Sequence, residues 1–156
     1  MTFLVSDVGG TNVRFALADG PSSPLTDIHS LKCADFAEIG DAFMAYLATL
    51  DADVAARVEA VAIAVAAPVN ARMVNVTNNH WCFDKPDLLA ALPGNRLLVV
   101  NDFTAQALAQ ADPCAHGNVQ LLAGTPDPKA PLLVIGPGTG LGVSALIPSA
   151  DGFVPI

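Results

Sequence analysis

Close to its start the chain reads FLVSDVGGTNVRFALA, from residue 3 to residue 18. The apolar run that ends at Asp7 predicts a short buried strand, and the alternation that begins at Val13 predicts a second one. The Gly9-Gly10 pair between them predicts a tight turn, because glycine accepts positive φ angles. We therefore expect a β-hairpin here and take it as the element around which the chain is organised.

The turn of this hairpin has the composition of a phosphate-binding loop. Gly9 and Gly10 carry no Cβ, so their backbone N–H groups can approach a polyanion closely. Thr11 and Asn12 add side-chain donors, and Asp7 can hold a cation through water. The alternative is an ordinary hairpin, in which the glycines only make the turn and Asp7 and Thr11 act as local caps.

The composition is that of a globular protein with a substantial core. The chain has 156 residues, of which 53% are hydrophobic and 14% are charged, which suits one domain or one domain plus part of another. A net charge of −8 argues against nucleic acid or an anionic membrane as the main partner. The three cysteines form no C-x-x-C pair, and neither a secretion signal nor a membrane-spanning run is visible. We expect a cytoplasmic protein with reduced thiols.

The later segments alternate between predicted strands and helices. Asp35 and Glu38 form a near capping box that is expected to start the first helix. The alternation predicts an α/β fold with a mixed sheet, followed by a proline-rich linker at 124–131. Strands are expected at 28–33, 60–69, 73–76, 97–100, 132–135 and 143–147, with a weaker one at 118–122, and helices at 36–50, 84–92 and 103–110.

A second glycine-rich loop reads GPGTGLG, from Gly136 to Gly142, between two apolar runs. It does not fit the dinucleotide pattern G-x-G-x-x-G, because residue 141 is Leu and residue 143 is Val, and it is not a Walker P-loop, because no Lys follows its glycines. We expect the turn amides and Thr139 to hold phosphate, and the two glycine loops together to form a nucleotide clamp. The repeated strand, turn and strand mark the start of a second domain.

Asn101 and Asp102 follow a predicted buried strand at the point where a helix begins. Open α/β sheets place their ligands at this edge. Asp102 is therefore the candidate general base for an attacking hydroxyl, with Asn101 holding neighbouring hydroxyls. The alternative is that Asp102 or Thr104 only caps the helix.

A second polar segment runs from Thr77 to Trp81. Its amides, Asn78 and Asn79, suit a polyhydroxylated ligand, and the Trp81 indole can cover a sugar ring. The equally weighted alternative is a turn in which Trp81 is anchored in the core.

Together these segments resemble bacterial glucokinase, of the hexokinase, actin and Hsp70 ATPase superfamily. Residues 7–14 resemble its first phosphate motif, 77–81 its sugar-side segment, 101–104 its catalytic segment and 136–142 its second phosphate motif. The resemblance spans essentially the whole chain. It implies a ribonuclease H-like (actin-like ATPase) domain with a mixed five-stranded sheet at 1–112, and the first hairpin of a second, similar domain at 113–156.

The resemblance implies ATP-dependent phosphorylation of glucose at the 6-hydroxyl, the first step of glycolysis. Asp102 would deprotonate that hydroxyl, and Asp7 would help to place Mg²⁺. One departure is Asn79, where many relatives have His. The implied sugar-binding residues are Asn101, Asn78, Thr77, Gly138 and Thr139, and the implied nucleotide-binding residues are Asp7, Gly9, Gly10, Thr11, Asn12, Gly138, Thr139 and Gly140.

Members of this family continue beyond the position of residues 153–155 with a sugar-holding loop that carries Glu and His, and then with most of the second domain. We therefore expect this chain to be an N-terminal portion that is inactive alone. Its expected partners are glucose, ATP and the C-terminal half of the same protein, and the complete protein is expected to be a homodimer. An apolar edge around 132–147 should be exposed.

Other functions remain open from the sequence. A sugar-responsive regulator would keep the clamp without catalysis, although no helix-turn-helix precedes Phe3. A phosphotransferase or phosphatase of the same superfamily could act on an acid or a phosphate ester, but neither polar segment supplies the Arg that an anionic substrate usually needs. A pure scaffold domain would bind neither nucleotide nor sugar.

Overall fold

The computed structural model describes residues 1–21, 23–111, 119, 121–125, 127, 129–137, 141–150 and 152–156. The chain divides into two compact units, Met1–Asp102 and Phe103–Ile156. The domain boundary predicted at residue 112 falls among residues outside this description and stays a prediction.

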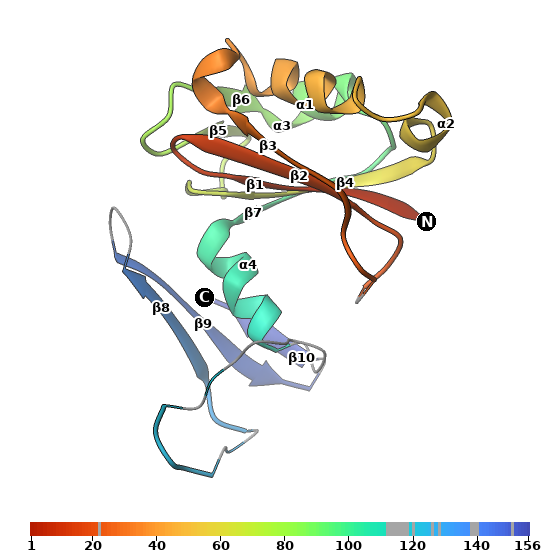
Figure 1. The fold of residues 1–156 in the computed structure, drawn as a ribbon. Coiled ribbons are helices and arrows are strands. Elements are labelled where there is room, and N and C mark those ends of the chain that lie inside the picture. Colours follow the sequence, from red (N-terminus) through yellow and green to blue (C-terminus); the bar gives the residue numbers. More distant parts are fainter. Residues whose placement is uncertain are drawn as a thin grey trace. The chain divides into compact units, whose positions relative to one another are not determined.

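The first unit is built on the predicted mixed five-stranded sheet (Figure 1). Its strand order is β3-β2-β1-β4-β7. The opening hairpin supplies β1 and β2, which pair antiparallel, as β2 and β3 do, whereas β1, β4 and β7 run parallel. The strands are β1 (Thr2–Val8), β2 (Asn12–Ala18), β3 (Thr26–Lys32), β4 (Val58–Val65) and β7 (Leu97–Asn101).

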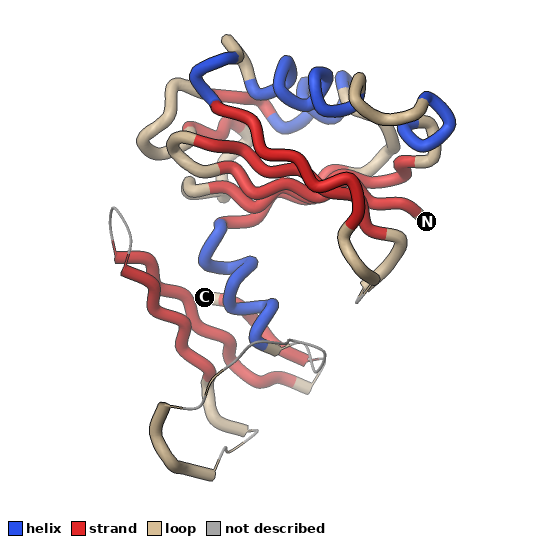
Figure 2. Tube along the Cα trace, viewed as in Figure 1, coloured by secondary structure: helices blue, strands red, loops and turns tan. Residues whose placement is uncertain are grey.

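The helices of the first unit cover one face of this sheet, as Figure 2 shows. A small two-stranded sheet, β5–β6, lies on the same side. These elements are the 3₁₀ turn η1 (Cys33–Asp35), α1 (Ile39–Leu47), α2 (Ala52–Ala55), β5 (Met73–Asn75), β6 (Cys82–Asp84) and α3 (Lys85–Ala91).

An aromatic cluster joins α1 to the hairpin. Ile39, Phe43 and Tyr46 fall on one helix face and are buried. The Phe15 ring from β2 lies 4.8 Å from the Phe43 ring, edge-on, and 4.8 Å from the Tyr46 ring, stacked. The core therefore forms between the hairpin and the helix that the sequence pattern predicts.

The predicted start of α1 was wrong. Asp35 belongs to η1, and Glu38 is the N-cap: it forms a capping box with Asp41, whose carboxylate accepts from the Glu38 N–H at 3.2 Å. The backbone N–H of Cys33 donates to the Thr11 carbonyl at 2.9 Å, so the chain first turns against the hairpin before the helix begins.

The other element predictions differ from the structure mainly at their ends. Asp84 caps α3 as predicted and accepts from the Asp87 N–H at 3.2 Å. β4 ends at Val65 rather than Val69, and α2, β6 and β10 were not predicted. In the weak strand predicted at 118–122, the described residues 119, 121 and 122 are not in a strand, and the others lie outside the description.

The second unit contains the predicted second hairpin. Its β8 and β9 pair antiparallel from Leu132 opposite Leu146 to Pro137 opposite Leu141, and β10 extends this sheet. The elements are α4 (Asp102–Gln110), whose first residue lies in the first unit, β8 (Leu132–Pro137), β9 (Leu141–Ser149) and β10 (Gly152–Pro155).

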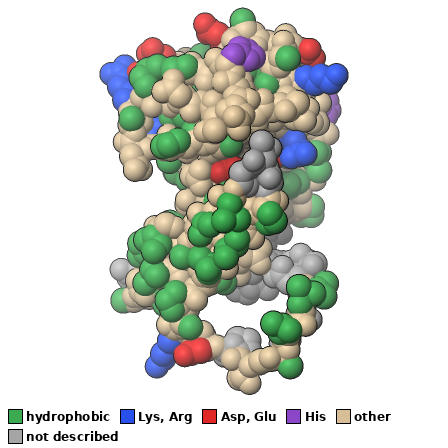
Figure 3. Space-filling model, turned by 90° about the vertical axis from the view of Figure 1, so that its left-hand side faces the viewer, with side chains coloured by type: hydrophobic (Ala, Val, Ile, Leu, Met, Phe, Trp, Pro, Cys, Tyr) green, Lys and Arg blue, Asp and Glu red, His purple; other side chains and the backbone are tan. Residues whose placement is uncertain are grey.

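Hydrophobic side chains are exposed on the second unit, as Figure 3 shows. Leu133 is 59% exposed, Leu141 is 70% exposed and Val143 is 53% exposed. The predicted exposed apolar edge is therefore confirmed for the described residues of the hairpin. Within the described part of the chain, no helix is long and apolar enough to cross a bilayer.

Tyr46 makes the fold sensitive to alkaline pH. It is the single tyrosine of the chain, it is buried, and its hydroxyl donates to the Asp27 carbonyl at 3.0 Å. Burial, with a smaller effect of the Asp27 charge, raises the pKa of Tyr46 to about 12. Because the folded state favours the neutral phenol, this contribution to stability is present below pH ~10 and is lost between pH ~10 and about 12.

We expect absorbance titration of the phenolate to give a midpoint well above 10 in the folded chain and close to ~10 in denaturant. In Tyr46→Phe, the loss of stability over this pH window should disappear. A midpoint near 10 while circular dichroism still reports a folded chain would contradict this prediction.

Candidate functional site

Three parallel strands end at one edge of the five-stranded sheet. Val8 of β1 pairs with Val65 of β4, and Val65 pairs with Asn101 of β7. The Gly9-Gly10 turn and the Asn101–Asp102 segment therefore leave the sheet at the same edge. They are separated by two strand spacings, each of about 4.8 Å. This is the edge at which open α/β sheets bind ligands.

The Gly9-Gly10 turn is closed by a hydrogen bond from the Gly9 N–H to the Asn12 carbonyl at 3.0 Å. A Cβ on Gly10 would lie 3.0 Å from the carbonyl oxygen of Asn78 and 3.2 Å from its Cβ. Asn78 itself has a positive φ of 57°. Glycine at position 10 thus lets the 77–81 segment pack directly onto the turn.

Asn79 holds the 77–81 segment on the hairpin. Its Nδ2 donates to the Gly9 carbonyl at 3.1 Å, and its Oδ1 accepts from the Trp81 N–H at 3.1 Å. Thr77 is fixed at the other end of the segment, because its N–H donates to the Ala66 carbonyl at 2.9 Å. The residue that departs from the family pattern therefore has a structural role, since it joins the 77–81 segment to the Gly9-Gly10 turn.

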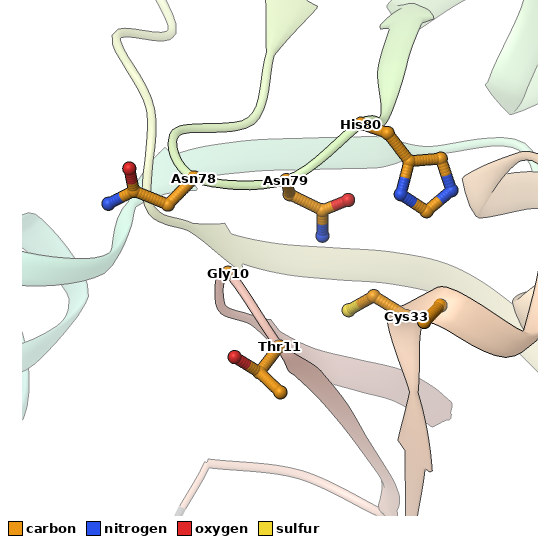
Figure 4. Close-up of a pocket in the computed structure, with 7 residues that line it drawn as sticks. Gly10, Thr11, Cys33, Asn78, Asn79 and His80 are labelled. Carbon is orange, nitrogen blue, oxygen red and sulfur yellow. The ribbon is translucent and has the colours of Figure 1, made fainter.

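A pocket of about 480 Å³ lies between the turn and this segment (Figure 4). The sequence had predicted five of its lining residues for ligand binding or a polar cluster, and had not predicted Cys33 or Ala34. Burial raises the pKa of the Cys33 thiol, whose Sγ lies 3.7 Å from the Gly9 carbonyl oxygen. The lining residues are Gly10, Thr11, Cys33, Ala34, Asn78, Asn79 and His80.

Trp81 is anchored in the core and does not present its indole to the pocket. Its side chain is 2% exposed, and its Nε1 donates to the Phe36 carbonyl at 3.2 Å. The His80 Nε2 lies 2.9 Å from the same oxygen. Of the two readings of Trp81, the core anchor is confirmed and the sugar-covering role was wrong.

Asp7 pairs with a basic residue that the sequence reasoning missed. Arg14 stands opposite Asp7 in the hairpin register, and its Nη1 lies 2.9 Å from Asp7 Oδ2. Both side chains are more than half exposed, so the pair adds little stability, but it fixes the direction of the carboxylate. The sequence reasoning expected a turn at Gly9-Gly10 alone, which would place Asn12 across from Asp7; in the structure Val8 pairs with Val13, and this register brings Arg14 there instead.

The donor set at Asp7 fits a Mg²⁺ ion held through water. Protein Mg²⁺ sites in phosphate chemistry commonly use one or two carboxylates, several waters and the substrate phosphates. Among the residues that the structure describes, no three metal-binding side chains gather in one place. A single exposed carboxylate beside the Gly9-Gly10 turn agrees with that kind of site and not with a closed protein cage.

Asn101 and Asp102 occupy the junction between β7 and α4. The Asn101 Nδ2 donates to the Ala67 carbonyl at 3.3 Å, which ties this strand end to the segment after β4. Asp102 begins α4, where the positive end of the helix dipole favours a carboxylate. The catalytic role of Asp102 and its role as a helix cap both remain compatible with this placement.

The central residues of the second glycine loop, Gly138, Thr139 and Gly140, lie outside the described residues, so their phosphate and substrate contacts stay predictions. Gly136 and Gly142 are described, and they face each other across β8 and β9.

Replacing Asn79 with Ala should loosen the link between the turn and the 77–81 segment. The change removes a donor and an acceptor from two hydrogen bonds, so we expect a loss of about 1–3 kcal/mol in the free energy of unfolding. Urea unfolding of the chain measures it, with Asn75→Ala, at an exposed position of β5, as the matched control, expected within about 0.5 kcal/mol of the wild type. Equal effects of the two substitutions would show that Asn79 does not hold the segment.

The mixed five-stranded sheet with its opening hairpin defines the class of protein: an α/β domain with the actin-like ATPase fold. The Glucokinase family model matches residues 4–156. The chain belongs to the glucokinase family.

Relatives and solved structures agree with this assignment. The glucokinase of Chromobacterium violaceum is 45% identical over 150 residues, which are 96% of this chain and 42% of that protein. The crystal structure of a glucokinase from an Antarctic psychrotroph matches 99% of this chain and 49% of its own, with 33% identity and a TM-score of 0.84. A Streptomyces griseus ROK family glucokinase, solved in complex with glucose and AMPPNP, shares the fold at 24% identity and a TM-score of 0.64, over 99% of this chain and 46% of its own. The chain spans about half the length of the curated relatives that it matches.

Proposed function

We propose that this chain supplies the first domain of an ATP-dependent kinase that phosphorylates the 6-hydroxyl of glucose, the first step of glycolysis. The observation that carries the proposal is the register that brings the Gly9-Gly10 turn and Asn101–Asp102 to one sheet edge. The sugar-side segment packs onto the same turn through Gly10 and Asn79. Membership in the glucokinase family supports the choice of reaction.

In the proposed reaction, Asp102 accepts the proton of the 6-hydroxyl as that oxygen attacks the γ-phosphoryl group of ATP. Asn101, Asn78 and Thr77 bind the other sugar hydroxyls. Phosphoryl transfer depends mainly on positioning and charge stabilisation, which a turn of backbone amides supplies. The proposed phosphate-binding groups are residues 9–12 on the first turn and Gly138, Thr139 and Gly140 on the second.

Asp7 would hold Mg²⁺ through water, with its carboxylate oriented by Arg14. When bound, the ion neutralises charge on the β- and γ-phosphates. The choice of ATP is supported by the glucose and AMPPNP complex of the Streptomyces griseus enzyme, which has the same fold.

The proposal also requires a C-terminal half that completes the kinase. Because the chain spans about half of its relatives, we propose that catalysis needs the C-terminal half of the same protein, which would also cover the exposed apolar side chains of β8 and β9. We further propose a cytoplasmic homodimer for the complete enzyme.

The test compares the 156-residue chain with a form that also contains the C-terminal half. We expect the longer form to make glucose 6-phosphate and ADP in equal amounts, and the chain alone to show little or no turnover. Calorimetry with glucose and with AMPPNP runs in parallel. Binding of either ligand by the longer form without any turnover would contradict the kinase and favour a regulator, and no binding of either would favour a scaffold.

A further inference from the structure

The Phe103 ring occupies the place where two glycines of the second hairpin lack side chains. Gly136 and Gly142 are direct partners across β8 and β9. A Cβ on Gly142 would lie 1.8 Å from Cε2 and 2.0 Å from Cζ of Phe103, and a Cβ on Gly136 would lie 2.7 Å from Cζ. These separations are far inside van der Waals contact, so the ring is seated directly on the glycine pair.

Glycine in a strand interior normally weakens the strand, because it costs backbone entropy and packs no side chain. Two glycines at one cross-strand pair are therefore unfavourable unless something uses the space. An aromatic ring over such a pair restores the lost packing. Packing against the ring thus explains why two of the four positions in the GPGTGLG loop are glycine, and this explanation is separate from phosphate binding.

The ring belongs to the first turn of α4. Phe103 directly follows Asp102, with which this helix begins, and the hairpin under the ring carries the predicted phosphate turn at 138–140. Any change that breaks the contact between the ring and the glycine pair will therefore alter the contacts that fix the first turn of α4 on the hairpin.

We infer that Phe103 is a positioning residue of the proposed kinase: its ring, seated on Gly136 and Gly142, holds the first turn of α4 on the β8–β9 hairpin and so sets the orientation of Asp102. This inference rests on the proposed function. Phe103 touches no reacting atom in this account and acts only through Asp102 and the hairpin.

Loss of the ring should therefore lower kcat much more than it changes KM. Misplacement of a catalytic group by about 1 Å can cost about 100-fold in rate. In the longer form of the enzyme we expect Phe103→Ala to lower kcat by about 10- to 100-fold, with the KM for glucose changed by less than about threefold. Gly142→Ala should produce a similar loss, because the new methyl group expels the same ring.

The losses of kcat caused by Phe103→Ala and Gly142→Ala should not be additive in free energy. Once Phe103→Ala has removed the ring, a methyl group at position 142 meets no obstacle, so the double variant should be no slower than the slower single variant. Phe103→Tyr should restore most of the rate, because it keeps the ring on the glycine pair.

Two control substitutions make the same kind of change at positions away from the ring: one removes an apolar side chain, and the other adds a methyl group to a glycine. Leu108→Ala removes an apolar side chain from the same helix at a position that is 41% exposed. Gly124→Ala adds a methyl group where nothing lies within 4 Å of the new Cβ. Both should keep kcat within about twofold of the wild type, since surface changes of this kind have small effects.

The inference is overturned if the wild type phosphorylates glucose while Phe103→Ala keeps its kcat, or if the losses from Phe103→Ala and Gly142→Ala multiply in the double variant. If Phe103→Ala does not fold, Phe103→Leu takes its place against Phe103→Tyr, and equal kcat values for those two would overturn the inference as well. If the wild type does not phosphorylate glucose at all, the proposed function fails and the positioning role fails with it. In that case the thermal midpoints of the same variants still decide whether the ring is seated on the glycine pair.

Discussion

Replacing Asp102 with Asn is expected to lower kcat for glucose phosphorylation by about 100- to 10,000-fold in a form of the protein that contains both halves, because Asn cannot accept the hydroxyl proton. The substitution keeps the size and shape of the side chain, and Asn also caps helices well, so the start of α4 should persist. The KM values for glucose and ATP should change little. Steady-state kinetics with a coupled ADP assay measure both effects.

The matched control for this prediction is Asp87→Asn. Asp87 is likewise an acidic residue in the first turn of a helix, α3, and it is exposed. The Asp87→Asn substitution should leave kcat unchanged. This control therefore separates the loss of a general base from the general effect of removing a negative charge at a helix N-terminus. An Asp102→Asn variant that folds and retains the wild-type rate would reject the role of Asp102 as base and favour the helix cap.

Replacing Trp81 with Ala is expected to cost about 3–5 kcal/mol in the free energy of unfolding. The indole is 2% exposed and packs within the core of the first unit. Its loss leaves a cavity and removes the N–H donor to the Phe36 carbonyl. Urea unfolding of the chain, followed by circular dichroism, measures the change.

Trp81→Phe keeps an aromatic ring but loses the N–H, so its cost should fall clearly below that of Trp81→Ala. Met44→Ala, at a position that is 53% exposed, should stay within about 0.5 kcal/mol of the wild type. Had Trp81 covered the sugar, Trp81→Ala would raise the KM for glucose and leave stability nearly unchanged. That result would contradict the core position.

The hairpin and the parallel strands were predictable because their signals are local. The alternation from Val13 and the glycine pair before it specify two strands and a tight turn, and the structure places them as β1 and β2. The order of apolar runs and helices then suffices for a mixed sheet. The position of Asn101 at the same sheet edge as the turn follows from the parallel pairing of β1 with β4 and of β4 with β7.

What the sequence left open depends on contacts between distant residues. Asp35 and Glu38 look like a helix start, but the bond from Cys33 to the Thr11 carbonyl makes a separate turn first. Whether Trp81 faces the core or a ligand is decided by Phe36, far away in the chain. Likewise, only the register of β8 and β9 shows that Gly136 and Gly142 are cross-strand partners and that both contact the Phe103 ring.

The most direct test of the central claim is a crystal structure of the complete enzyme with glucose and a non-hydrolysable ATP analogue. The account predicts that an Asp102 carboxylate oxygen lies about 2.6–3.2 Å from the glucose 6-hydroxyl. It also predicts that the amides of residues 9–12 and of 138–140 contact the nucleotide phosphates. A structure in which Asp102 is remote from that hydroxyl, or in which the two glycine turns face away from the phosphates, would contradict the account.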